Sequence, residues 1–136
     1  MNTLIETAFL AAVGLLPGLS GIQHLTGVSA DENTVEGSAI IFHCPDCEHT
    51  VGSLWKATIR FRLETPAFEG DRAGHDQRLN ALRHWLEQPL VVGAAIHSSG
   101  LNVCGYFVRK SQTSLEHNRW VAEIELVAGV DTSTGA

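Results

Sequence analysis

The clearest alternation of hydrophobic and polar positions runs over residues 53–65. Five apolar residues alternate there with five mainly charged ones: Trp55, Ala57, Ile59, Phe61 and Leu63 against Lys56, Thr58, Arg60, Arg62 and Glu64. Because successive side chains of a strand point to opposite faces, this pattern predicts a strand with one buried face and one mainly basic face. Pro66 is expected to end the strand, since proline cannot donate to a ladder. We expect the other elements to pack around this strand.

Weaker patterns predict the remaining elements. The expected helices cover residues 3–16, which begin with a capping box of Thr3 and Glu6, and a second segment ending near Glu87, capped by Asp71 or Asp76. The expected strands cover residues 38–44, 100–110 and 120–127, with turns at Pro45-Asp46 and at the polar residues 111–118. Residues 90–98 fit either a short helix or a buried strand.

The order α-β-β-α-β-β predicts a single α+β domain over residues 1–136. We expect a mostly antiparallel sheet of four strands, or slightly more, with two main helices packed on one face. If the two strand pairs lie side by side, Glu123 and Glu125 come to lie opposite Arg60 and Arg62. Such cross-strand pairs contribute a few tenths to about 1 kcal/mol each.

Two segments have no regular pattern. Residues 17–37 contain four glycines and a polar run, which is long for a plain connection. They either include a short strand near residues 22–25 or form a candidate inter-subunit arm that becomes ordered on a partner. Residues 129–136 are expected to be a flexible C-terminal tail.

Charge is distributed unevenly along the 136 residues. The first 55 residues contain six acidic side chains and no Lys or Arg, so the net charge of -6 arises entirely there. A general nucleic-acid-binding protein would have a basic excess, and this chain has none. The apolar run near the N-terminus lacks a basic leader and is too short to span a membrane, so we expect a soluble protein made in the cytoplasm. An acidic and a mixed region suit head-to-tail contact between copies.

The stretch around Cys44 and Cys47 is the main candidate for chemistry. A C-x2-C pair is half of a zinc site, and Cys104 with His49, or another histidine, would have to complete it. No second pair has the required spacing, so we expect no metal and keep a small zinc-binding module as the alternative. A redox role is less favoured, because no helix begins at Cys47 to lower its pKa. The histidines form no recognisable catalytic motif, so we expect neither an enzyme nor a cofactor.

The layout as a whole resembles the tail-terminator and neck-region proteins of long-tailed bacteriophages. The resemblance rests on the N-terminal amphipathic helix, the short apolar strand 39–42, the alternating strand 54–63, the helix 75–86 and a closing hairpin with Asn118-Arg119-Trp120 and Glu123-Ile124-Glu125-Leu126. It implies a virion protein that forms a ring, usually a hexamer. Such a ring caps the tail tube and joins it to the neck or stopper protein on the head side. The Cys44/Cys47 pair is not part of this resemblance.

These considerations give a set of candidate interface residues. They come from the glycine-rich segment and from the basic face of the long strand: Leu19, Ile22, His24, Leu25, Asp31, Glu32, Lys56, Arg60 and Arg62.

Overall fold

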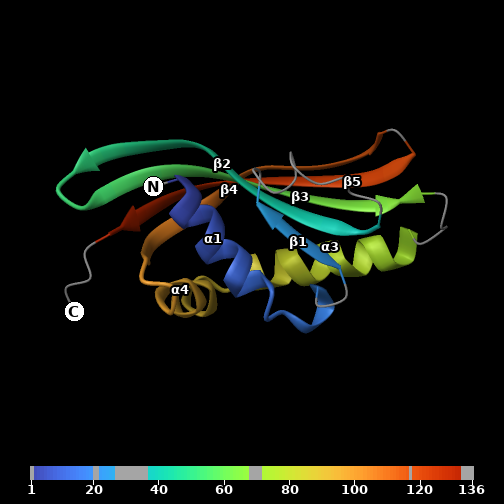
Figure 1. Cartoon of the computed structure of the whole chain (residues 1–136), viewed down its shortest axis with the longest axis horizontal. Coiled ribbons are helices and arrows are strands. Elements are labelled where there is room, and N and C mark those ends of the chain that lie inside the picture. Colours follow the sequence, from blue (N-terminus) through green and yellow to red (C-terminus); the bar gives the residue numbers. More distant parts are fainter. Residues whose placement is uncertain (1, 20–21, 27–36, 68–71, 117, 133–136) are drawn as a thin grey trace.

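The computed structural model describes the chain except residues 1, 20–21, 27–36, 68–71, 117 and 133–136. Three α-helices, one short 3-10 helix and five strands make up the described part (Figure 1). In chain order they are α1 (Asn2–Val13), η1 (Pro17–Leu19), β1 (Gln23–Thr26), β2 (Ala39–Val51), β3 (Leu54–Pro66), α3 (Arg72–Leu86), α4 (Pro89–His97), β4 (Asn102–Glu116) and β5 (Arg119–Asp131).

The strands form one mixed sheet in the order β1-β2-β3-β5-β4. β1 runs parallel to β2, and the other neighbours are antiparallel. The predicted four-stranded, mostly antiparallel sheet with two helices is therefore wrong. A fifth strand, β1, lies at one edge, and a third helix, α4, precedes β4. The four residues of β1 are too few to show a period in the sequence, although a strand in this region was one of the two alternatives.

β3 lies at the centre of the sheet, as its alternating pattern predicted. Ile59 is completely buried, whereas Arg60 beside it is exposed. The register places Arg60 opposite Glu125 and Arg62 opposite Glu123, which confirms the predicted cross-strand pairs. The two faces of β3 therefore have the roles that the sequence predicted.

The helices cover one face of the sheet (Figure 1). Phe61 from β3 contacts Phe9 of α1 and Phe42 of β2, with ring centroids 5.6 and 5.1 Å apart. Leu79, Leu82 and Trp85 of α3 are also buried in this core. The other sheet face carries the charged side chains of β3 and β5.

β2 is longer than predicted because it continues through Pro45-Asp46. The expected turn is wrong: the pairing with β3 shifts register between His43 and Asp46, so the strand contains an irregularity there and runs on to Val51. Such a bulge accommodates a proline that cannot donate to the ladder. The actual turn lies at Gly52, whose φ of 58° favours glycine.

β4 is also longer than predicted, since the expected polar turn at residues 111–118 is mostly strand. β4 continues to Glu116, and the reversal uses Asn118 at a φ of 60°. Residues 90–98 resolve as the helix α4, which starts with Pro89 in the first turn. α1 ends three residues before the predicted boundary, and Asp76 lies inside α3 instead of capping it.

The two irregular segments are partly described. Of residues 17–37, the structure describes η1, β1 and a few neighbours, and the rest of the candidate arm lies outside the described residues. β5 extends to Asp131, so the first part of the expected tail, residues 129–131, belongs to a strand. Within the described residues, no helix has the length and apolar character needed to cross a membrane.

Candidate functional site

The sheet face opposite the helices carries a network of charged side chains. Glu125 accepts hydrogen bonds from Arg60 at 3.1 Å and from Arg109 of β4 at 3.0 Å. The bond from Arg109 lowers the pKa of Glu125, against the effect of burial, and Arg60 lowers it further. A lowered pKa means that this stabilisation is present above the ordinary carboxyl pKa and is lost as the pH falls through the lower, folded-state value.

Arg62 binds three carboxylates of the same subunit. Its guanidinium donates to Glu64 at 3.1 Å and also pairs with Glu123 and Glu116. The predicted basic face is therefore largely neutralised within one subunit. Four charged side chains of this face differ, because they form no salt bridge with any described residue: Asp46, Glu48, Lys56 and Lys110.

The Cys44–Cys47 stretch lies at the irregularity of β2. Cys44 is buried, and its backbone N–H donates to the Glu6 carboxylate of α1 at 3.3 Å. Burial raises the pKa of the Cys44 thiol to about 12, with further contributions from Cys47 and Glu6. Burial likewise raises the pKa of Cys47. Thiols of this kind stay protonated near neutral pH, whereas metal binding and nucleophilic attack require the thiolate.

The other members of the alternative zinc site have different surroundings. Cys104 is exposed on β4, and the His49 ring packs edge-on against Trp55 at 5.1 Å. His49 Nε2 lies 2.6 Å from the carbonyl oxygen of Gly52. The described residues contain no group of three or more His, Cys, Asp or Glu side chains that could hold a metal ion.

We predict that Cys44→Ser combined with Cys47→Ser leaves a folded protein. The buried thiol at Cys44 packs in the core, so the double change should cost about 1 kcal/mol of unfolding free energy. Chemical denaturation of both proteins, with and without EDTA, measures this. If chelator unfolds the wild type and leaves the double variant unchanged, the protein does depend on a metal.

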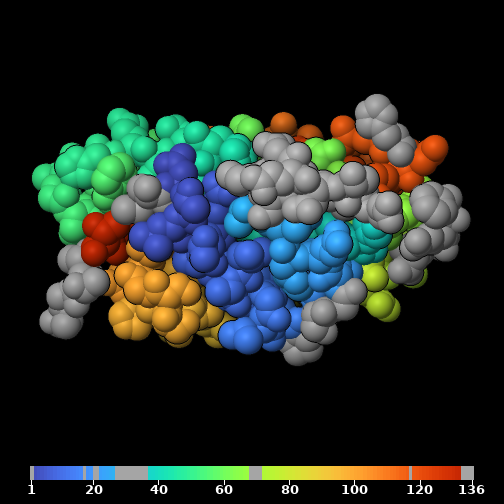
Figure 2. Space-filling model, viewed as in Figure 1, coloured from blue at the N-terminus to red at the C-terminus, as the bar shows by residue number. Residues whose placement is uncertain are grey.

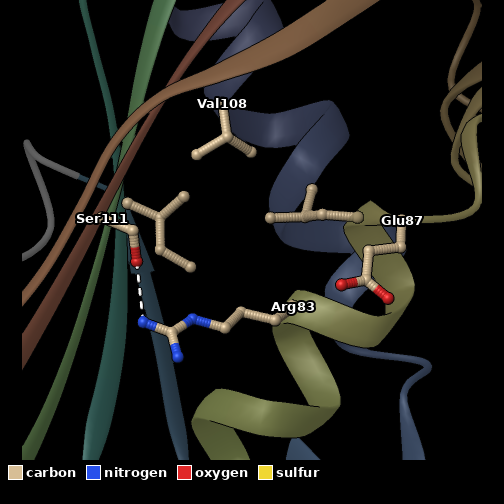
Figure 3. A pocket seen from close by; sticks show the side chains of 6 residues that line it. Arg83, Glu87, Val108 and Ser111 are labelled. Carbon is tan, nitrogen blue, oxygen red and sulfur yellow. Dashed lines mark hydrogen bonds between the residues drawn. The ribbon is translucent and has the colours of Figure 1, made fainter.

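A groove lies between the C-terminal half of α3 and the edge strand β4 (Figure 3). Its volume is about 210 Å³, and apolar atoms form most of its wall. Arg83 reaches across it and donates to Ser111 Oγ at 2.8 Å. The lining residues are Arg83, Leu86, Glu87, Val108, Ser111 and Ile124. A groove of this size is small for a typical ligand, whose pockets measure roughly 300–1,000 Å³, and suits a single inserted side chain.

The structure does not bring the predicted interface residues together on one surface. Leu19 is completely buried in the subunit core, so its side chain is unavailable to a neighbouring subunit. His24 and Leu25 belong to β1. Burial lowers the pKa of His24, and a hydrogen bond between its ring and the backbone of Leu19 opposes this effect. Ile22 packs partly buried against the core. Lys56, Arg60 and Arg62 lie on the charged face of β3, and Asp31 and Glu32 lie outside the described residues.

Sequence reasoning predicted the first part of β4, as a strand over residues 100–110, but missed its continuation to Glu116. Phe107, Val108 and Leu115 are all about half exposed on this strand, at 59%, 47% and 56%. Nearly all side chains of the segment 111–116 are polar, so neither face of the strand shows a hydrophobic pattern in the sequence. The register shift between Val108 and Lys110 also moves the even-numbered residues to the opposite face, so the earlier alternation could not be extended into this segment.

Comparison with solved structures identifies a protein of the same fold. The chain shares its fold with a chain of the virion of a native gene transfer agent particle. The superposition covers 96% of this chain and 95% of the gene transfer agent chain, with a TM-score of 0.53 and 10% sequence identity. At this identity the likeness establishes the fold and not the role. No protein-family model and no curated protein matches the sequence.

Proposed function

We propose that the protein is a structural component of a virion and acts by assembly, without catalysis. The observation that carries this proposal is the fold shared with the gene transfer agent virion chain over almost the entire length of both chains. The role agrees with the one that the resemblance to tail-terminator and neck proteins implies.

Within the virion, the protein forms a ring that caps the tail tube and joins it to the neck protein on the head side. The charged face of the sheet, which is broad and largely self-neutralised, supports an assembly role. Head-to-tail contacts between such subunits generate closed rings when the rotation between neighbours closes.

Native mass measurement of the purified protein, alone and mixed with tail tubes, tests this proposal. We expect a closed oligomer, a hexamer if the family resemblance holds, that electron microscopy locates at tube ends. Ile59→Asp, which should unfold the subunit, is the negative control for tube binding. A protein that stays monomeric in the presence of tubes and leaves their ends free contradicts the proposal. An oligomer found on the head side alone assigns it to another neck component.

A further inference from the structure

The sheet has two edges that no described strand covers. One is the outer edge of β4, which pairs only with β5. The other is the second half of β2, because β1 pairs only with its first four residues, up to Phe42. Beyond that point, the backbone of Cys44 is hydrogen-bonded to Asn2 and Glu6 of α1. Residues 46–51 pair with β3 on one side only among the described strands. Exposed edges carry rows of N–H and C=O groups that can pair with another chain.

We propose that these two edges pair with each other between copies, so that β4 of one subunit extends the sheet of the next at residues 46–51 of its β2. The inference deepens the proposed function, because it names the surface through which the ring forms. The occupant of each edge is a second copy of this chain.

Strand direction makes this junction regular. Across β2, β3, β5 and β4 every neighbour is antiparallel, so β2 and β4 at the two ends run in opposite directions. When one copy follows another with a small rotation, β4 meets the next β2 in an antiparallel arrangement. The alternation then continues without a break around a ring. A junction of β4 with β4, or of β2 with β2, would instead give a closed two-fold dimer.

Charge complementarity selects this junction over the others. The free half of β2 carries Asp46 and Glu48, and β4 carries Lys110 beside Arg109, which is bound to Glu125 of its own subunit. Asp46 and Glu48 lie opposite Thr58 and Lys56 of β3, and Lys110 lies opposite Glu125 of β5. These partners share the charged face of the sheet, so Asp46, Glu48 and Lys110 lie on the same face. Neither Glu48 nor Lys110 has a salt-bridge partner among the described residues of its own subunit. A β4–β4 junction would bring basic residues together, and a β2–β2 junction acidic ones.

The surroundings of the β4 edge fit an added strand. Strand addition uses main-chain hydrogen bonds for affinity and small pockets for alternate side chains. The groove of about 210 Å³ borders this edge and is lined on the β4 side by Val108 and Ser111 (Figure 3). Side chains on the helix side of an incoming β2, such as that of His49, would lie over this groove. From Lys110 onward β4 pairs regularly with β5, so the part of the junction beyond Lys110 has a regular strand to pair with.

Charge exchange between the two edges tests the proposal. Glu48→Lys and Lys110→Glu each place like charges across the junction, whereas the double variant restores an opposite pair. We expect each single variant to raise the apparent dissociation constant of the oligomer about tenfold or more. The double variant should return to within about threefold of the wild type. Light scattering after size exclusion, at several protein concentrations and at low salt, measures the constants.

A matched control separates a junction effect from a general charge effect. Asp76→Lys makes an equivalent acidic-to-basic change on α3, away from both edges. This variant should assemble like the wild type. In a second measurement, backbone amides of β4 around Lys110, residues 107–112, should exchange with deuterium more slowly in the oligomer than in the dissociated subunit. This readout does not depend on how well a variant folds.

The outcomes distinguish this inference from the proposed function. Three results would overturn the edge pairing: single variants that assemble like the wild type, a double variant that does not restore assembly, or unchanged exchange at residues 107–112. A wild type that still caps tail tubes in those cases leaves the proposed function standing. Edge-dependent oligomers that ignore tail tubes support the pairing and overturn the tube-capping role. A wild type that is monomeric under all conditions overturns both.

Discussion

Ile59→Asp is expected to unfold the isolated subunit. Ile59 lies in the middle of the central strand, is completely buried, and faces the helices. A carboxylate at this position would have neither water nor a cation to compensate its charge. The change should cost about 4 kcal/mol or more, which is comparable with the total stability of about 5–15 kcal/mol of a typical domain.

Arg60→Ala is the matched control one residue along the same strand. Arg60 is exposed and pairs with Glu125, which retains its hydrogen bond from Arg109 when Arg60 is lost. The loss should cost about 0.5 kcal/mol or less. Circular dichroism during thermal and urea unfolding measures both variants. Equal destabilisation by the two changes would mean that the faces of β3 are assigned wrongly.

Phe61→Ala is expected to produce the second-largest loss of stability. The Phe61 ring joins α1 and β2 to the central strand, because it contacts both Phe9 and Phe42. Removing it leaves a cavity between layers that are already packed, at a cost of about 3–5 kcal/mol. For a chain of this size, that corresponds to a decrease in melting temperature of roughly 10 °C or more.

Phe107→Ala removes the same side chain from the edge strand. Phe107 is 59% exposed, so the subunit should lose about 1 kcal/mol or less. Calorimetry on both variants, with the subunit dissociated, gives the comparison. If Phe107→Ala lowered the unfolding free energy as much as Phe61→Ala does, the open face of the sheet would stabilise the subunit as much as the helix-covered face.

The sequence by itself determined the central part of the fold. Alternation over β3 is strong enough to assign its two faces, since a shift by one residue would move every hydrophobic side chain into water. The same pattern in β5 then placed Glu123 and Glu125 opposite the arginines. Helices on one face followed from apolar residues at helical spacing. The sequence suggested the virion role only through the order and general character of its elements. The support for that role comes from the comparison of whole folds.

Only the tertiary structure decided the edges of the sheet. β1 is short and pairs through its backbone, which leaves no side-chain period to read. β2 continues through Pro45 at an irregularity where Glu6, distant in sequence, accepts the N–H of Cys44. β4 continues through polar residues because β5 supplies its hydrogen bonds, whatever side chains it carries. Backbone pairing is almost independent of side-chain identity, so the strands with open edges, on which the proposed assembly depends, are the ones that sequence patterns describe least well.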